Sequence, residues 1–305
     1  MILQGKHDTM SQIFFILVLG ISLNLQLLCS VCSAQKQAFA CQHVPRVFRQ
    51  LAKELVSDGF DSKEICRIFS HPKVRFNPKV MPRKVTHNEA ALHYDIFLQK
   101  DRIERAKRYL QNNRKVFDLV EKEYGIPKEI KVAILLVETD LGRYLGSDIA
   151  LNNLASMAVV TDTSVIKRYS PDYYKSLKKK DISRLKKRLR EKSRWAYSEL
   201  KSLIIYSRLN GLDIHQIKGS IFGAIGLCQF MPSNALKFGV DFNKDGKVDL
   251  FDPEDAIASM ANYLHFYGWS PEIPARGQIR VIKQYNHSTP YAKTVLKVAQ
   301  KIRQL

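Results

Sequence analysis

Apolar residues recur at steps of three and four along almost all of the chain after residue 42, which is the spacing of one helix face. The segment 44–60, VPRVFRQLAKELVSDGF, has this spacing and reaches Gly59 near its end, where glycine favours helix termination. The next segment, 61–69, begins with Asp61 followed by Glu64, three residues apart as in a capping box. Two consecutive helices are therefore predicted in this part of the chain.

The same spacing continues further along the chain. A long amphipathic helix is predicted over 101–124, and Pro127 favours the start of another over 128–141. Strict alternation of apolar and polar residues, typical of strands, is scarce, and 247–251 is the best short candidate. We predict a mainly α-helical fold without an internal repeat or a low-complexity linker.

The amino-terminal region has the features of a secretory signal peptide. A short basic lead precedes an apolar stretch over 11–31, and small residues follow it. Cleavage is expected after Ala34 or Ala40. We assign 1–34 to the signal peptide and 35–305 to one domain. A retained membrane anchor or a lipid-attached cysteine is the alternative, although polar residues inside the stretch weaken it as a membrane span.

Composition and charge limit the kinds of partner. The 305 residues are 45% hydrophobic, enough for a substantial core, and the formal net charge of +20 favours an anionic partner. Thirteen Lys or Arg residues against three acidic ones lie in 167–194. This run is either a solvated helix face or a contact surface for a polyanion. Export argues against a nucleic-acid partner.

Five cysteines are present, and export permits disulfides. Cys29 and Cys32 are expected to leave with the signal peptide. Cys41, Cys66 and Cys228 then remain, and Cys41 with Cys66 is the candidate pair. The chain has neither a CxxC pair with metal spacing nor an HExxH motif after residue 42, so a zinc site has no support.

Glu138 follows an unbroken apolar run within the predicted helix 128–141. Its neighbours on that helix include Ile134 and Leu135, with Gly142 one turn on. An apolar environment favours the protonated form of a carboxyl, which can then donate a proton. Gly142 is expected to leave room for a ligand beside the carboxyl.

The segment 219–233, GSIFGAIGLCQFMPS, is rich in small residues. Gly219, Gly223 and Gly226 permit close backbone approach and unusual dihedral angles. Gln229 is a lone amide among apolar residues, and it needs partners that are either the backbone or the hydroxyls of a sugar. No GK[ST] follows, so the glycines do not form a phosphate-binding P-loop.

Residues 241–255, DFNKDGKVDLFDPED, have the spacing of an EF-hand calcium loop, with Gly246 at the sixth position. Asp255 is expected to close the site, because Asp252 precedes Pro253 and should cap the next helix. Asp252 is the alternative closing ligand, and an acidic turn without metal is the alternative structure. The predicted metal ligands are Asp241, Asn243, Asp245, Lys247, Asp252 and Asp255.

Four segments in this order and spacing resemble the membrane-bound lytic murein transglycosylase B family. They are VETDLGRYLG (137–146), GSIFGAIGLCQFMPS (219–233), VDFNKDGKVDLFDPEDAIASMANYLHFYGW (240–269) and QYNHSTPYA (284–292). The resemblance covers roughly residues 39–305. It implies a lysozyme-like helical domain over about 116–305 with additional helices, a basic helical insertion over about 165–210, and a single EF-hand-like metal loop.

The resemblance also implies a chemistry. Glu138 would be the single acid/base that cleaves peptidoglycan and forms a 1,6-anhydromuramoyl end. Ser220 and Asn286 would hold the acetamido group or the saccharide near it. Further saccharide contacts are expected from Gln229, Tyr263, Tyr285 and Tyr291. Asp140 lies about 200° round the helix from Glu138 and cannot share its face, so no second carboxylate is apparent. A muramidase that adds water and a non-catalytic wall-binding scaffold are the alternatives.

Cofactors, partners and location follow from the same resemblance. It implies a structural calcium ion, no organic cofactor, and peptidoglycan glycan strands as the substrate. An anionic membrane or wall surface is a further candidate partner, nucleic acid is not, and a monomer is expected. The expected location is the periplasm, with membrane association open. Two departures from the family pattern are Cys228, where a small or aromatic residue is expected, and an aspartate as the last metal ligand.

Overall fold

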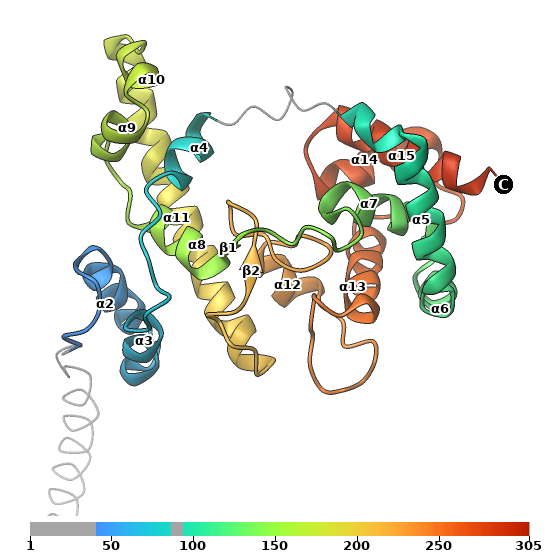
Figure 1. The fold of residues 1–305 in the computed structure, drawn as a ribbon, viewed down its shortest axis with the longest axis horizontal. Coiled ribbons are helices and arrows are strands. Elements are labelled where there is room, and N and C mark those ends of the chain that lie inside the picture. The colour runs from blue at the N-terminus through green and yellow to red at the C-terminus, as the bar shows by residue number, and fades with distance from the viewer. Residues whose placement is uncertain (1–40, 87–93, 305) are drawn as a thin grey trace, which may run out of the picture. The chain divides into compact units, whose positions relative to one another are not determined.

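The computed structural model of the chain describes residues 41–86 and 94–304 (Figure 1). The predicted signal peptide, 1–34, lies outside these residues. The chain divides into two units, Met1–Gln42 and His43–Leu305, and the second contains every element named below. None of the described helices is both long and apolar enough to cross a membrane.

The described part of the second unit is mainly helical, as predicted. The helices of its first half are α2 (Arg49–Ser57), α3 (Ser62–Phe69), α4 (Val80–Thr86), α5 (Lys100–Asn112), α6 (Arg114–Tyr124), α7 (Lys128–Thr139) and α8 (Ala150–Ala158). Those of its second half are α9 (Ser164–Tyr169), α10 (Pro171–Lys175), α11 (Lys179–Leu209), α12 (Pro232–Phe238), α13 (Pro253–Phe266), α14 (Ala275–Tyr285) and α15 (Thr289–Arg303). Two short 3₁₀ turns are η2 (Arg46–Phe48) and η4 (Tyr94–Leu98).

The strands of the described residues form one two-stranded sheet, and single antiparallel bridges also pair Ile225 with Gly219 and with Phe230. β1 (Asp148–Ile149) pairs antiparallel with β2 (Lys218–Gly219), and Asp148 lies opposite Gly219. The predicted strand over 247–251 is wrong, because this segment is part of the loop between α12 and α13. The small sheet joins the segment after α7 to the glycine-rich segment that begins at Gly219 (Figure 1).

Helix boundaries agree with the sequence where a side chain caps the helix. The Asp61 carboxylate accepts a hydrogen bond from Glu64 N (2.8 Å) at the start of α3. The predicted helix over 101–124 is instead two helices, α5 and α6, which meet at Asn113 with φ −112° and ψ 20°. The helical spacing of apolar residues continues across this break, so the pattern alone could not reveal it.

Helix α7 belongs to the core, since its residues Ile130–Leu136 are all buried. Helix α15 packs along α7, and α11 packs against α8 and α12 (Figure 1). Lys131 is fully buried in this core, where its Nζ donates to Phe117 O (3.2 Å) and Ile126 O (2.9 Å). Burial lowers the pKa of Lys131 to about 7.

The cysteines have two different states. Cys41 and Cys66 are disulfide-bonded, and Cys228 is a free, buried thiol. Burial raises the pKa of Cys228 to about 12. The Cys228 thiol is therefore neutral at ordinary pH and packs as a small apolar side chain.

Candidate active site

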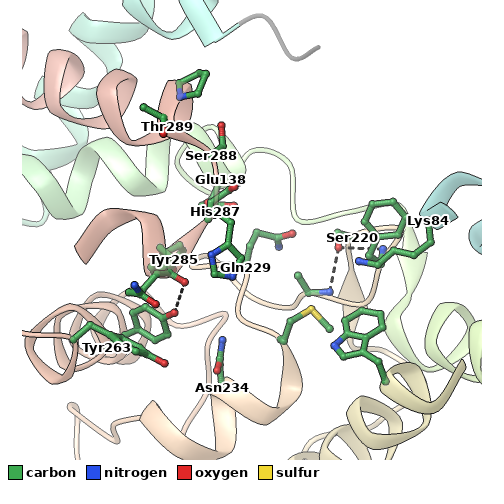
Figure 2. Close-up of a pocket in the computed structure, with 18 of the residues that line it drawn as sticks. Lys84, Glu138, Ser220, Gln229, Asn234, Tyr263, Tyr285, His287, Ser288 and Thr289 are labelled. Carbon is green, nitrogen blue, oxygen red and sulfur yellow. Dashed lines mark hydrogen bonds between the residues drawn. The ribbon is translucent and has the colours of Figure 1, made fainter. Parts of the chain in front are cut away.

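A cavity of about 1160 Å³ lies beside the carboxyl end of α7 (Figure 2). Side chains from α7, α11, α13 and the segment after β2 line it, together with residues from the turn between α14 and α15. Six of the seven residues predicted to be catalytic or substrate-binding belong to this lining: Glu138, Ser220, Gln229, Tyr263, Tyr285 and Asn286. The seventh, Tyr291, lies outside the lining.

The end of α7 determines where Glu138 lies. Asp140 (φ 50°) and Leu141 (φ 62°) are left-handed, so the helix ends at Thr139 and not at the predicted residue 141. Thr139 Oγ1 donates to Leu227 O (3.1 Å) and accepts from Gly142 N (3.0 Å). This buried threonine ties the helix end to the glycine-rich segment and presents Glu138 to the cavity.

Gly142 does not leave room for a ligand, contrary to the expectation from the sequence. A Cβ atom at this position would lie 2.6 Å from Leu227 Cδ2. The glycine is needed because Leu227 fills the space and because φ is +86°.

Tyr291 forms a hydrogen bond with Glu138 and does not line the cavity. Glu138 is half-buried, and its Oε1 accepts a hydrogen bond of 2.6 Å from Tyr291 Oη. Tyr291 is only 1% exposed, and its N–H donates to the capping hydroxyl of Ser288 at the start of α15. Tyr94 packs edge-on against the Tyr291 ring at 6.0 Å between centroids. The tyrosine thus fixes one oxygen of the Glu138 carboxyl.

Glu138 is the single carboxylate among the described residues that line the cavity. Asp140 belongs to a separate cluster, where it pairs with Arg105 (2.9 Å) and Arg102 (3.4 Å) on α5. The expectation that Asp140 does not share the face of Glu138 agrees with this placement.

The glycine-rich segment forms a tight loop at the cavity wall. Ser220 Oγ accepts hydrogen bonds from Phe222 N (3.3 Å) and Ala224 N (3.1 Å). A Cβ atom at Gly146 would lie 1.9 Å from the carbonyl oxygen of Gly219. The backbone at Gly219 can therefore come this close only to a glycine. These contacts hold the Ser220 hydroxyl at the cavity edge (Figure 2).

Gln229 has an unusual backbone conformation for a side chain of its size. Its φ is +49°, and its Nε2 donates to Gly226 O at 2.9 Å. A left-handed non-glycine residue costs about 1–2 kcal/mol relative to the usual conformation. Such strain is often found at functional sites. Its amide carbonyl oxygen is an acceptor at the cavity lining.

Two tyrosines build the opposite wall with their rings. Tyr263 Oη donates to Gln284 O (2.6 Å), and Tyr285 Oη donates to Cys228 O (2.5 Å). Their rings meet edge-on at 5.2 Å between centroids. Burial raises the pKa of both tyrosines, so the hydroxyls stay neutral donors. Both hydroxyls bind backbone carbonyls. Tyr263 is only 4% exposed and packs against the rings of Tyr267 and Tyr285, so it supports the wall from behind.

Several lining residues were missed by the sequence analysis. They are Lys84, Lys192, Trp195, Phe222, Asn234 and His287, among others. Lys192 and Trp195 are three residues apart on α11 and so share a face. Lys84 and Phe222 come from distant segments, and no spacing in the sequence could have joined them.

The loop between α12 and α13 contains the predicted metal ligands. Asp241 Oδ1 accepts from Asp245 N (3.1 Å), and Asn243 Oδ1 accepts from the same N–H (3.0 Å). Lys247 N donates to Asp245 Oδ1 at 2.9 Å. Carboxylate and amide oxygens are ligands that suit calcium. Within 41–86 and 94–304, however, no group of three or more His, Cys, Asp or Glu side chains gathers as a metal site.

Asp255 and Asp252 divide two roles in this loop. Asp255 is buried, and its two oxygens accept from Phe242 N and Asp249 N, both at 2.8 Å. Burial raises the pKa of Asp255. Asp252 accepts from the first turn of α13 at 2.8 Å and caps that helix, as predicted. Asp255 thus closes the loop through hydrogen bonds to its backbone.

Comparisons with known proteins identify a relative in sequence and several similar folds. Membrane-bound lytic murein transglycosylase B of Escherichia coli (strain K12) is 28% identical over 224 residues, which are 72% of this chain and 53% of that protein. The chain therefore spans about half the length of this curated relative. The Escherichia coli lytic transglycosylase Slt35, solved in complex with calcium, aligns with a TM-score of 0.66 at 24% identity, covering 84% of this chain and 92% of that one.

A third similar protein is SltB3 from Pseudomonas aeruginosa, solved in complex with NAG-anhNAM-pentapeptide. Its TM-score is 0.67 at 18% identity, and the alignment covers 85% of this chain and 80% of that one. These two structures establish a shared fold. The model of the Transglycosylase SLT domain matches residues 44–281, which is most of the chain. The protein belongs to the Transglycosylase SLT domain family.

Proposed function

We propose that this protein is a lytic transglycosylase of peptidoglycan with Glu138 as its single acid/base. The proposed bond is the β-1,4 linkage from N-acetylmuramic acid to N-acetylglucosamine. One observation carries the proposal: Glu138 is the single carboxylate among the described lining residues, and Tyr291 holds it at 2.6 Å. A glycosidase of the usual type needs a second carboxylate flanking the bond. A reaction in which the substrate's own C6 hydroxyl attacks C1 needs no second carboxylate.

The proposed reaction has two proton transfers at one carboxyl. Glu138 first gives its proton to the glycosidic oxygen, and the bond from that oxygen to C1 of the muramoyl residue breaks. The substrate's acetamido group stabilises the cation at C1. The Glu138 carboxylate then takes the proton of the C6 hydroxyl while O6 bonds to C1. The product is a 1,6-anhydromuramoyl end, no water is consumed, and Glu138 is protonated again.

The other lining residues would position the saccharide. Both lone pairs of the Ser220 hydroxyl accept backbone N–H groups, so this hydroxyl can meet a substrate carbonyl only as a donor. An acetamido oxygen is such an acceptor, and Asn286 would add a second polar contact. The half-buried ring of Tyr285 would pack against a sugar face, and the buried Tyr263 would hold that ring in place. Gln229 would accept from sugar hydroxyls.

The mass of the products released from purified sacculi tests this proposal. A lytic transglycosylase releases fragments lighter by one water than those of a muramidase. Hydrated reducing ends would support the muramidase instead. Binding to sacculi without release of any fragment would support a non-catalytic scaffold.

We further propose that calcium binds the loop 241–255, with Asp241, Asn243, Asp245, Asp255 and the carbonyl oxygen of Lys247 as ligands. Asp252, the alternative closing ligand, caps α13. Support comes from the oxygen donors of this loop and from the calcium complex of Slt35. The ion would stabilise the approach to α13, which carries Tyr263. No organic cofactor is proposed.

A thermal unfolding series with added calcium tests this site. The midpoint should rise with calcium, by mass action on the folded state. Asp245→Ala should abolish that rise. Asp181→Ala, which removes a partly exposed acid on α11 paired with Arg184 at 3.4 Å, is the matched control and should retain it. An unchanged midpoint in the parent protein would refute the site.

Finally, we propose export to the periplasm and contact of the segment 167–194 with an anionic lipid surface. The segment contains the end of α9, all of α10 and the first half of α11, and most of its Lys and Arg side chains are exposed. Each such charge near an anionic surface contributes about 1 kcal/mol. Sedimentation with vesicles containing phosphatidylglycerol should exceed that with phosphatidylcholine and should fall with salt. Equal sedimentation with both would refute the contact.

A further inference from the structure

Helix α12 begins at the cavity wall without a capping side chain of its own. Its N-cap residue is Met231, whose side chain makes no capping hydrogen bond, and Pro232 lies in the first turn. The carboxylate of Glu199, on α11, supplies acceptors from another helix. Its Oε2 accepts from Ser233 N (2.9 Å), and its Oε1 accepts from Ser233 Oγ (2.8 Å). Two hydrogen bonds therefore fasten the start of α12 to α11.

The Glu199 carboxylate is buried, with only 6% of the residue exposed. Burial of a carboxylate is unfavourable unless hydrogen bonds compensate it. In the part of the chain that the structure describes, both of its side-chain hydrogen bonds come from Ser233. Ser233 is the last residue of the segment 219–233, so this contact anchors the end of the glycine-rich segment.

The anchored helix start presents two side chains to the cavity. Asn234 follows Ser233 directly, and both Asn234 and Met231 line the cavity. In Figure 2 the Asn234 side chain points from α12 toward the middle of the cavity. Within 41–86 and 94–304, the Asn234 side-chain amide makes no hydrogen bond. Its donor and its acceptor are thus both open to a ligand.

We propose that Glu199 is a positioning residue, which fixes the start of α12 and so directs the Asn234 amide at the bound glycan. This inference rests on the proposed function for the nature of the ligand. An amide that both donates and accepts matches the hydroxyl and acetamido groups of a sugar. Glu199 is not among the residues that line the cavity, so it acts on binding through Asn234 and takes no part in the proton transfers.

The test is a double-mutant cycle between Ser233 and Asn234, measured on soluble glycan strands without cross-links. Asn234→Ala should raise KM by about tenfold, the effect of one or two lost hydrogen bonds, and leave kcat near wild type. Ser233→Ala removes the Oγ bond to Glu199 and should raise KM by about three- to tenfold. In the Asn234→Ala background, Ser233→Ala should change KM by less than about twofold, because the group that it positions is gone.

Glu199→Gln provides a second route to the same result. Its amide oxygen still accepts one of the two hydrogen bonds from Ser233, so this variant should raise KM as Ser233→Ala does. Ser207→Ala is the matched control. Ser207 lies on α11, its Oγ donates to Ile204 O at 3.0 Å, and it is outside the cavity lining. This control should leave KM and kcat unchanged.

Each outcome supports or overturns the proposal. An unchanged KM for Asn234→Ala or for Ser233→Ala overturns it, and so does an equal rise in KM from Ser233→Ala in both backgrounds. These results leave the proposed function standing. A wild type that releases no fragments from sacculi overturns the proposed function instead. The cycle is then measured as the Kd for the same strands, where coupling between Ser233 and Asn234 supports the positioning role and its absence overturns it.

Discussion

Replacing Tyr291 by phenylalanine removes one hydroxyl from the site and keeps the ring that packs against Tyr94. The lost interaction is the 2.6 Å hydrogen bond to Glu138 Oε1, made by a tyrosine that is 1% exposed. After Glu138 gives up its proton, this bond becomes a bond to a carboxylate. Such bonds contribute about 1.5–3 kcal/mol. We therefore expect kcat/KM to fall by roughly 10- to 150-fold.

The assay is the release of soluble fragments from purified sacculi, expressed per folded molecule as measured by circular dichroism. Tyr197→Phe is the matched control, since Tyr197 Oη also binds a carboxylate oxygen, that of Asp58 at 3.0 Å, away from the cavity lining. This control should keep wild-type activity. A Tyr291→Phe protein as active per folded molecule as wild type would refute the reasoning.

Three further predictions concern stability. Gly146→Ala should lower the free energy of unfolding, measured by chemical denaturation, by about 3 kcal/mol or more, because its Cβ meets the Gly219 carbonyl oxygen at 1.9 Å. Gly59→Ala has a similar φ but lies in open space, and it should lower this free energy by about 1 kcal/mol. Gln229→Gly should be more stable than Gln229→Ala by about 1 kcal/mol, since φ is +49°, while both lose activity. The pKa of Lys131 falls from 10.5 to about 7 on folding, so between these pH values the unfolded chain binds the extra proton. The unfolding free energy of wild type relative to Lys131→Met should therefore rise with pH across this window, by up to about 1.4 kcal/mol per unit; a flat difference would contradict this.

Local chemistry made parts of this fold predictable from the sequence. The caps at Asp61 and Asp252 were read correctly because a capping residue acts within three residues of itself. The break between α5 and α6 at Asn113 was not predicted, because the spacing of apolar residues is insensitive to a local change in backbone dihedral angles. The space expected beside Gly142 was not there, because Leu227, from a distant segment, fills it.

The site residues likewise include some that were apparent from the sequence and others that depend on tertiary structure. Glu138 was apparent as a carboxyl after an apolar run, and the lining contains the motif residues Ser220 and Gln229. The contact from Tyr291 to Glu138 joins α15 to α7 and depends on how these helices pack. The contact of Glu199 with Ser233 likewise depends on tertiary structure and leaves no periodic signal.

The most direct test of the central claim is the fragment-release rate of Glu138→Gln on purified sacculi. Glutamine keeps an oxygen that can accept the Tyr291 hydrogen bond, so the fold and sacculus binding should persist. It cannot donate a proton as an acid, and we expect the rate to fall by about 10²–10⁴-fold. Asp140→Asn, which alters the nearby carboxylate paired with Arg105, is the control and should stay active. A Glu138→Gln protein that still releases fragments at a rate close to wild type would contradict the account.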